Sequence, residues 1–107
     1  MRMMLSVSIP VETGNAAAVK GNLYSAIQQI LADLRPEAAY FTEHEGERHV
    51  FTIFDMRDSS QLPGISEPWF LAFNARVQVC PAMSLQDLTD GLHWLQLAVK
   101  SYGKTGA

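Results

Sequence analysis

The order of strand-like and helix-like patterns along the chain constrains its fold more than any single residue does. Residues 4–9 alternate between inward apolar and smaller or more flexible side chains, which is the period of a strand with one buried face. Pro10 ends that strand, and residues 11–18 read as a loop that leads into a helix. Leucines and isoleucines within residues 23–34 recur at helical spacing, and Pro36 ends the predicted helix. The chain therefore begins as a strand followed by an amphipathic helix.

The next segment predicts a β-hairpin. Residues 38–42 and 49–54 are rich in aromatic and β-branched side chains, and Glu45-Gly46 lies between them as the turn. A loop of two or four residues gives the same register, with Glu43 opposite Arg48. One face then carries Ala38, Tyr40, Thr42, His49, Phe51 and Ile53. The other carries Ala39, Phe41, Glu43, Arg48, Val50, Thr52 and Phe54. Both faces are largely apolar, which indicates that both are covered.

The remainder of the chain supplies a second helical region, a short strand and a last helix. The serine pair at 59–60 suits the start of a short helix, and Ser66-Glu67-Pro68-Trp69 suits the start of another. Val77 and Val79 mark the last strand, and Ser84 begins a C-terminal helix with a capping pattern. The resulting order, β-α-β-β-α-β plus a helix, predicts an α+β domain of the ferredoxin-like type.

Composition is typical of one compact domain spanning residues 1–107, with 48% hydrophobic and 18% charged residues. The net charge of −3 argues against a nucleic-acid partner, which basic clusters would hold. Cys80 is the only cysteine, so no intrachain disulfide forms and a reducing compartment is favoured. The apolar start is too short and too alternating for a secretion signal, and no run is long enough to span a membrane. We therefore expect a cytoplasmic protein with no membrane partner.

One face of the predicted sheet lacks a helical cover. If the apolar residues of the first strand face the helices, then Ser6 and Ser8 lie on the other side with Arg76, Gln78 and Cys80 of the last strand. A covered face lined by small polar groups suits a small-molecule cavity. A wet interface between two copies, without a ligand, explains the same pattern equally well. Both readings predict a homodimer in which the partner covers this face.

The hairpin tip carries the densest group of titratable side chains. Strand alternation separates the glutamates and histidines between Glu43 and His49, so we predict a solvated loop and no metal site. Glu43 and Arg48 form a better-defined pair, either as an exposed cross-strand contact or as a gate that orients a carboxylate or phosphate. Cys80 has no evident base beside it and reads as a small buried side chain. His93 reads as a surface or packing residue.

Two longer stretches carry a more specific likeness: Pro36 to Glu43, followed by Gly46 and Arg48, and Glu67 to Ala75. They resemble a small bacterial family that has the dimeric α+β barrel fold and no assigned activity, and the likeness covers nearly the whole chain. The positions that match the family pattern are Tyr40, Thr42, Glu43, Arg48, Trp69 and Asn74, whereas His49 and Cys80 lie outside it. The wider superfamily includes cofactor-independent quinone-forming monooxygenases, haem-degrading enzymes and lactone isomerases, an analogy at the level of fold alone.

These observations predict a homodimeric small-molecule-binding domain with a pocket on the open sheet face and with no cofactor. The alternative is a cofactor-independent oxygenase or isomerase acting on a small metabolite, for which Tyr40, Glu43 and His49 are the candidates for proton transfer. The candidate pocket residues are Ser6, Ser8, Tyr40, Thr42, Glu43, Arg48, His49, Trp69, Asn74 and Gln78.

The C-terminal helix carries a narrow apolar seam made of Leu85, Leu88, Leu92, Leu95, Val99 and Tyr102. Fewer than three heptads cannot sustain an independent coiled coil, so the seam must dock onto a preformed surface. The main expectation is packing against its own domain. The alternative is docking at the dimer boundary, where Trp94 would close one end of the pocket.

Overall fold

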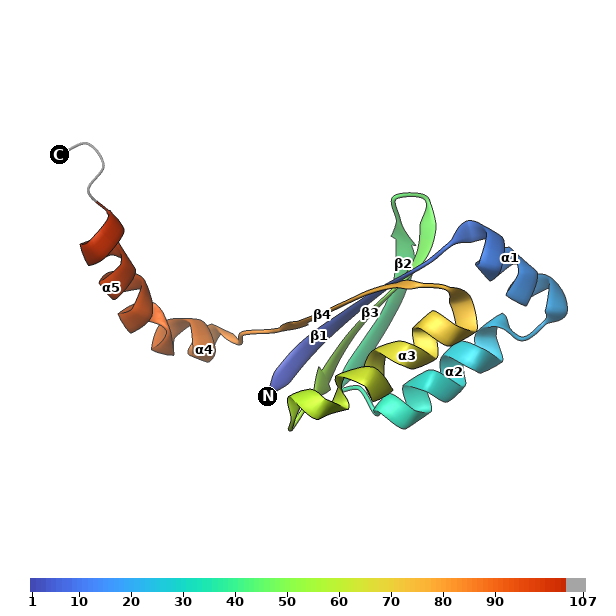
Figure 1. Cartoon of the computed structure of the whole chain (residues 1–107), viewed down its shortest axis with the longest axis horizontal. Coiled ribbons are helices and arrows are strands. Elements are labelled where there is room, and N and C mark those ends of the chain that lie inside the picture. Colours follow the sequence, from blue (N-terminus) through green and yellow to red (C-terminus); the bar gives the residue numbers. More distant parts are fainter. Residues whose placement is uncertain (104–107) are drawn as a thin grey trace.

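The computed structural model describes residues 1–103 as a four-stranded antiparallel sheet, a set of helices on one side of it and a helical extension (Figure 1). The elements in chain order are β1 (Arg2–Ile9), α1 (Val11–Lys20), α2 (Leu23–Leu34), β2 (Ala38–His44), β3 (Glu47–Asp55), the short 3-10 helix η1 (Ser59–Gln61), α3 (Leu62–Phe73), β4 (Arg76–Pro81), α4 (Leu85–Asp90) and α5 (Leu92–Tyr102).

The strands are ordered β2-β3-β1-β4, so the first strand of the chain lies between β3 and β4. With helices between β1 and β2 and between β3 and β4, this arrangement is of the ferredoxin-like type. The hairpin has the predicted register, with Glu43 opposite Arg48. Its two-residue turn requires positive φ at both positions, and Glu45 and Gly46 adopt φ values of 52° and 77°.

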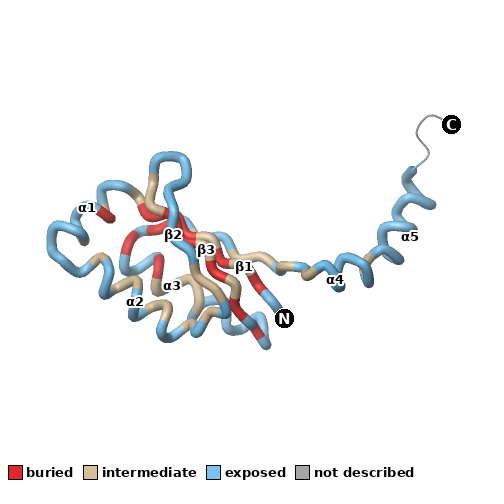
Figure 2. The backbone as a smooth tube through the Cα atoms, turned by 180° about the vertical axis from the view of Figure 1, so that it is seen from behind, coloured by how far each residue is buried: buried red, intermediate tan, exposed pale blue. Residues whose placement is uncertain are grey.

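The hydrophobic core lies between the sheet and the helices, which share one side of it (Figure 1). Its members alternate along the strands, as buried positions on one sheet face must. They are Met3, Leu5, Val7, Ile9, Val50, Phe54, Met56, Trp69, Phe73 and Ala75. Figure 2 shows these buried segments concentrated in the strands and in the part of α3 that faces them.

Helix α1 occupies most of the segment that the sequence predicts to be a loop. Gly14, which looks like a loop residue, is instead buried within the helix. A side chain does not fit there, because a Cβ would lie only 2.5 Å from Nη1 of Arg48. Asn15 also lies inside α1, and its Oδ1 accepts a hydrogen bond from Arg48 at 3.2 Å. Close contact between α1 and β3, rather than chain reversal, thus explains the small residues here.

Helix α3 also differs from the prediction, because it runs through Pro68 without starting again there. The cap of the preceding turn is Asp58, whose Oδ1 accepts from the backbone N–H of Ser60 at 2.9 Å. A second proline, Pro63, lies in the first turn of α3, where the missing N–H costs nothing. The sequence therefore predicted a helix in this region correctly, but it placed the start near Ser66, about one turn after the actual start of α3 at Leu62.

We call α4 and α5 with their N-cap, residues 84–102, the arm. It extends away from the sheet (Figure 1), and its capping box between Ser84 and Asp87 forms as predicted. The prediction that this region packs against its own domain is wrong. The six seam side chains remain 43–85% exposed, and Gly91 divides the expected single helix in two. Figure 2 shows α5 exposed along its length.

Candidate functional site

The side of the sheet away from the helices, which we call the open face, changes in polarity along the strands. Backbone pairing aligns its residues into three rows that cross all four strands, with the shorter pairs Arg2–Asp55 and His44–Glu47 at the two ends. The apolar row consists of Ala38, Ile53, Met4 and Cys80. The middle row consists of Tyr40, Phe51, Ser6 and Gln78. The polar row consists of Thr42, His49, Ser8 and Arg76. The open face is therefore apolar where β4 ends and polar where β4 begins.

His49 is the organising residue of the polar row. Its side chain is only 6% exposed, and both ring nitrogens are engaged. Nε2 lies 2.6 Å from Oγ of Ser6, and Nδ1 lies 2.8 Å from Oγ of Ser8. The two serines are two residues apart on β1, so strand alternation places both hydroxyls on the same face, one on each side of the imidazole.

This bracketing gives the two hydroxyls opposite roles. A neutral imidazole has one N–H and one bare nitrogen, so one serine accepts a hydrogen bond from the ring while the other donates to it. The accepting serine keeps its own O–H free as a donor, and the donating serine offers only lone pairs. Ser6 is the more exposed of the two, so it presents either an O–H donor or lone pairs to a bound molecule, depending on the tautomer of His49.

The surroundings of His49 favour its neutral form. The pKa of His49 is lowered from its ordinary value of 6.5, first by burial and then by the nearby His44, while Glu45 and Glu47 act in the opposite direction. Phe51 contributes to that burial, with its ring centroid 4.4 Å from that of His49. A neutral imidazole whose two nitrogens are both bonded to hydroxyls can act on a ligand through Ser6, the more exposed of the two serines.

A depression of about 630 Å³ lies over the polar and middle rows. Its lining combines the Ser6–His49–Ser8 group with aromatic, amide and charged side chains: Met4, Ser6, Ser8, His44, Glu45, His49, Phe51, Arg76, Val77 and Gln78. Arg76 is exposed and forms an ion pair with Glu47, which leaves part of its guanidinium facing solvent. This is a concave site with a few convergent polar groups, the usual character of a small-molecule pocket.

The structure brings six of the ten predicted pocket residues to the open face: Ser6, Ser8, Tyr40, Thr42, His49 and Gln78. Ser6, Ser8, His49 and Gln78 line the depression itself. Tyr40 and Thr42 lie on the neighbouring edge strand β2, and Tyr40 is 70% exposed.

Glu43 and Arg48 are cross-strand neighbours, but they lie on the side of the sheet that faces the helices. Arg48 donates to Asn15 of α1, and no ion pair joins it to Glu43 within residues 1–103. Both residues line a separate small hollow beside α1. The pair therefore does not lie at the mouth of the open-face depression.

Trp69 and Asn74 are also remote from the open face. Trp69 is completely buried in the core, where its ring packs near Phe73 with centroids 6.3 Å apart. Asn74 ends α3 in a left-handed conformation with φ of 52°, a geometry that asparagine tolerates better than most residues. Both residues have evident structural roles where they stand.

His44 and Arg76 are lining residues that the sequence reasoning did not include. His44 shares the parity of Tyr40 and Thr42 along β2, so alternation alone could have found it. The sequence suggests a solvated tip for His44 because the turn residues follow it directly, starting with Glu45. The sequence does place Arg76 on the right face, but nothing in the pattern reveals its contact with Glu47 across β1.

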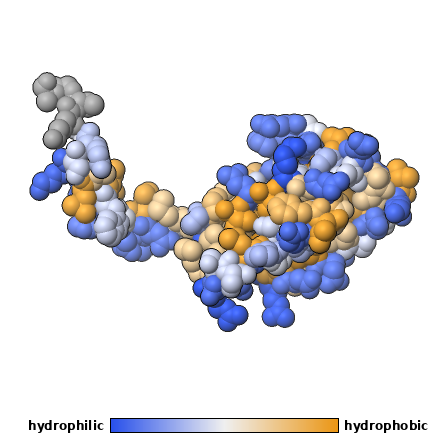
Figure 3. All heavy atoms as spheres, in the orientation of Figure 1, coloured by the Kyte–Doolittle hydropathy of each residue, from blue (hydrophilic) through white to orange (hydrophobic). Residues whose placement is uncertain are grey.

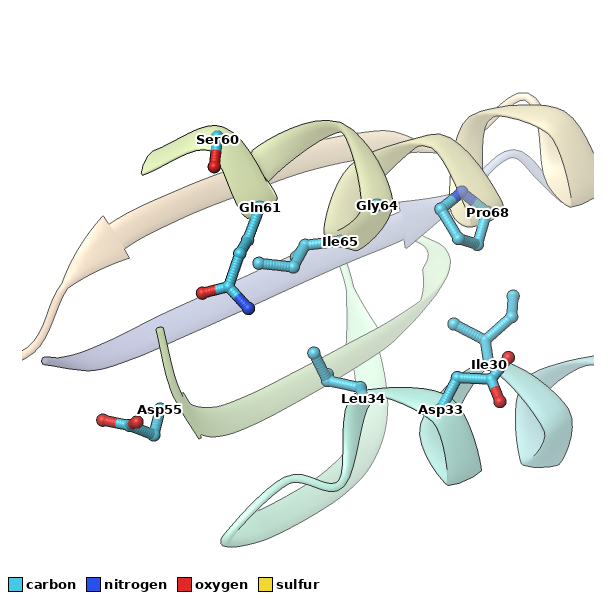
Figure 4. Close-up of a pocket in the computed structure, with 9 residues that line it drawn as sticks. All are labelled: Ile30, Asp33, Leu34, Asp55, Ser60, Gln61, Gly64, Ile65 and Pro68. Carbon is cyan, nitrogen blue, oxygen red and sulfur yellow. The ribbon is translucent and has the colours of Figure 1, made fainter. Parts of the chain in front are cut away.

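A second cavity, of about 390 Å³, lies between α2, α3 and the end of β3 (Figure 4). Ile30 and Leu34 of α2 face Ile65 of α3 across it, and Asp33 and Asp55 stand at its rim. The side-chain oxygen of Gln61 is already engaged, because it accepts from the backbone N–H groups of Arg57 and Asp58. This cavity has no buried polar group aimed into it, so the open face is the stronger candidate site.

Residues 1–103 offer neither a metal centre nor a membrane-spanning helix. No group of three or more histidine, cysteine or acidic side chains comes together there in a way that could hold a metal ion. None of the helices described is both long and apolar enough to cross a membrane.

Comparison with known proteins supports the fold. No protein-family model matches the sequence, and no curated protein matches it at significant similarity. A solved structure that is similar is the formyltetrahydrofolate deformylase from Pseudomonas putida, with a TM-score of 0.50 and 12% sequence identity over 91% of this chain. The chain spans only 38% of that enzyme. At this identity the likeness shows a shared α+β fold with part of the deformylase and nothing of its reaction.

Proposed function

We propose that this chain is a small-molecule-binding domain whose site is the depression on the open face. The observation that carries the proposal is the Ser6–His49–Ser8 group, in which a buried imidazole is held from both sides at 2.6 and 2.8 Å. Such a group costs free energy unless all its hydrogen bonds are made. Its position on a sheet surface without helices points to a role in recognition, because the core on the other face does not need it.

The site favours a small aromatic or planar molecule that carries an anionic group. Phe51 and Tyr40 offer ring surface in the middle row, while Arg76 offers a guanidinium at the polar row. Arginine recognises carboxylates through paired N–H groups, and here a ligand would compete with Glu47 for them. Ser6, which is less buried than Ser8, supplies the hydroxyl that a ligand can reach.

We also propose that a second copy of the chain covers the open face, as in the dimeric α+β barrels that the sequence resembles. The twelve residues of the three rows include one formal charge, that of Arg76, together with aromatic, methionine and cysteine side chains, while the charged residues Arg2, Asp55 and Glu47 lie at the ends of the same face. Depletion of charge and enrichment in aromatic residues and methionine are characteristic of interface cores.

Native mass spectrometry of the protein purified under mild conditions tests whether it retains a small molecule. Calorimetric titration with benzoate then tests the proposed chemistry, with benzyl alcohol as the neutral counterpart. We expect benzoate to bind more tightly, and the substitution Arg76→Gln to remove that preference. Arg57→Gln, which removes an arginine outside the depression, is the matched control. Equal loss in both variants, or no preference in the unmodified chain, would overturn the anionic-ligand proposal.

A second candidate, a cofactor-independent enzyme that moves protons, is favoured by the short contact between Ser6 Oγ and His49 Nε2. A nucleophile or relay hydroxyl next to a base, with that base oriented by a third group, is the arrangement that proton-transfer and covalent catalysis require. Turnover of lactones or hydroquinones that is lost in His49→Gln, while benzoate still binds, would favour this function over simple binding.

A further inference from the structure

We propose that the arm of each protomer docks on the open face of a second copy, so that the partner's arm roofs the ligand site. This inference rests on the proposal that a second copy covers the open face, and it names the segment that does so. The chain exposes two apolar surfaces, one on the arm and one on the sheet, and neither has a partner within residues 1–103.

The arm is built to be buried on one side. Leu92, Leu95 and Val99 lie along one line of α5, and Trp94 and Ala98 widen it to nearly half of the helix circumference. These large side chains are strongly exposed, with Leu95 at 56% and Trp94 at 70%. Figure 3 shows apolar side chains gathered along the arm beside its charged ones. A helix of this length gains most of its stability from packing its apolar side, which needs a surface.

The arm is directed away from its own sheet. The backbone N–H of Ala82 donates to the carbonyl of Arg2 at 3.0 Å, so the ladder between β4 and β1 continues one residue beyond β4. Only Met83 and Ser84 then precede α4, and the hydroxyl of Ser84 accepts the N–H of Asp87 at 3.1 Å. Ala82 is fixed by the ladder and Ser84 by the capping box, so the segment between them is too short for the chain to turn back onto its own sheet.

The open face matches the arm in size and polarity. The arm helices α4 and α5 are about 9 Å and about 17 Å long, and a strand of eight residues is about 26 Å long. The arm leaves the sheet next to Cys80, at the apolar row, so a two-fold arrangement brings the seam of one chain to the apolar row of the other. Apolar side chains would then meet there, while the polar row would remain as the floor of the site.

The area is sufficient for a specific interface. Two helices about 10 Å wide, with lengths that sum to about 26 Å, cover on the order of 1,000 Å² when counted on both contacting surfaces and for both arms. Specific interfaces need roughly 1,000 Å² or more. Exchange of identical arms forms a closed two-fold pair, because each chain gives and receives the same contact.

A matched pair of substitutions in α5 tests the arm in the full-length protein. Leu95 belongs to the seam and His93 lies on the opposite side of the same helix, so Leu95→Glu and His93→Glu place the same charge on opposite sides. Sedimentation velocity should show a dimer for the unmodified chain. We expect Leu95→Glu to raise the dimer dissociation constant about tenfold or more, as loss of a central apolar contact does, and His93→Glu to leave it nearly unchanged.

Disulfide formation identifies which surface the arm meets. Cys80 is the only cysteine and belongs to the apolar row, so chains with native Cys80 can be mixed with Cys80→Ser chains that carry Leu88→Cys, Leu92→Cys or Leu95→Cys. We expect covalent dimers from at least one seam position and none from His93→Cys, which lies on the opposite side of α5. A separate, unmixed sample in which every chain carries both native Cys80 and Leu92→Cys tests whether a disulfide forms within one chain instead of between two chains.

Each result decides between the proposals. A dimer that survives Leu95→Glu and forms no cross-links overturns arm docking but leaves pairing through the sheets themselves. A linkage found only within single chains overturns exchange, because the arm then folds onto its own sheet. A monomeric unmodified chain overturns both the arm and the second copy, while benzoate binding remains a separate test of the ligand site.

Discussion

Ser6 and Ser8 contact different nitrogens of the same imidazole, yet they differ in exposure. Ser8 is 9% exposed and faces the buried Nδ1 of His49, whereas Ser6 is partly open to solvent. Alternation along β1 was enough to predict that both serines and His49 share a face. The hydrogen bonds were not predictable, because they depend on the side-chain rotamer of His49 and on the pairing of β1 with β3.

The two serines should therefore differ in their contribution to stability. Ser8→Ala leaves a buried ring nitrogen without a partner, and we expect it to lower the free energy of unfolding by about 1–3 kcal/mol. Ser6→Ala should cost less, because water can replace the lost hydroxyl. Chemical denaturation of both variants gives the comparison, and a larger loss in Ser6→Ala would show that the site is closed to solvent.

His49 also predicts a pH dependence of stability. Its folded-state pKa lies below the ordinary value of 6.5 because burial disfavours the charged ring. Above pH 6.5 both states hold a neutral imidazole; as the pH falls below that value, unfolded chains take up the proton first. The free energy of unfolding should then fall until the pH passes the folded-state pKa. Denaturation at a series of pH values should show this loss in the unmodified chain and its reduction in His49→Gln.

At the scale of elements, the sequence predicted what depends on local periodicity and missed what depends on contact. The strands, the hairpin register and α2 all follow from alternation or helical spacing. Helix α1 was missed because Gly14 and Asn15 look like turn residues. Both residues are instead explained by Arg48, which packs against Gly14 and donates to Asn15. The path of α3 through Pro68 was missed because tertiary packing of Trp69 and Phe73 outweighs a local break.

The two helical glycines, Gly14 and Gly64, give a matched test of that explanation. A Cβ at Gly64 would meet nothing within 4 Å, so Gly64→Ala should raise the free energy of unfolding by about 0.5–1 kcal/mol through helix propensity. At Gly14 the same gain is offset, because Arg48 must move and release Asn15. Thermal denaturation should show a smaller increase or a decrease for Gly14→Ala; equal stabilisation would mean that Arg48 moves at no cost.

The arm offers a test at the same scale. Ser84→Ala removes the capping hydroxyl of α4, which is worth about 0.5–2 kcal/mol to a helix. Because α4 and α5 stand clear of the sheet, we expect reduced helicity in the arm and unchanged protection of the sheet. Backbone chemical shifts and amide exchange measured by NMR distinguish this from a global loss. Faster exchange throughout β1 would show that the arm supports the domain directly.

For the molecule as a whole, the sequence predicted one sheet with an uncovered face but placed the C-terminal helix wrongly. Its apolar seam indicates that the helix must be buried, but a seam does not specify whether its own domain or a second chain buries it. The folded domain already satisfies its core without the arm, since the ten core residues all lie between Met3 and Ala75. The order of the strands, in contrast, follows from connection rules that apply to single domains.

Protection against amide exchange should follow the position of each strand in the sheet. β1 is hydrogen-bonded on both sides and carries four completely or almost completely buried apolar residues, so its amides should exchange most slowly. The edge strand β2 should exchange faster, since one side of it has no neighbour among residues 1–103. Exchange monitored by mass spectrometry checks this order, and slow exchange in β2 would reveal an additional strand from a partner.

The central position of β1 also bears on how fast the chain can fold. Leu5 lies opposite Thr52 and Val79, so the first strand to be synthesised has no partner until β3 is made, about halfway along the chain, and lacks its second partner until β4 is made. Pairings so distant in sequence carry a large loop-closure cost and slow the search for the native state. In a growing polypeptide, meanwhile, the apolar side of β1 stays uncovered while α1, α2 and the hairpin can form from local contacts. Chaperone dependence during synthesis should therefore depend on how long β1 stays unpaired. A circular permutation that moves β1 to the end of the chain would shorten this time.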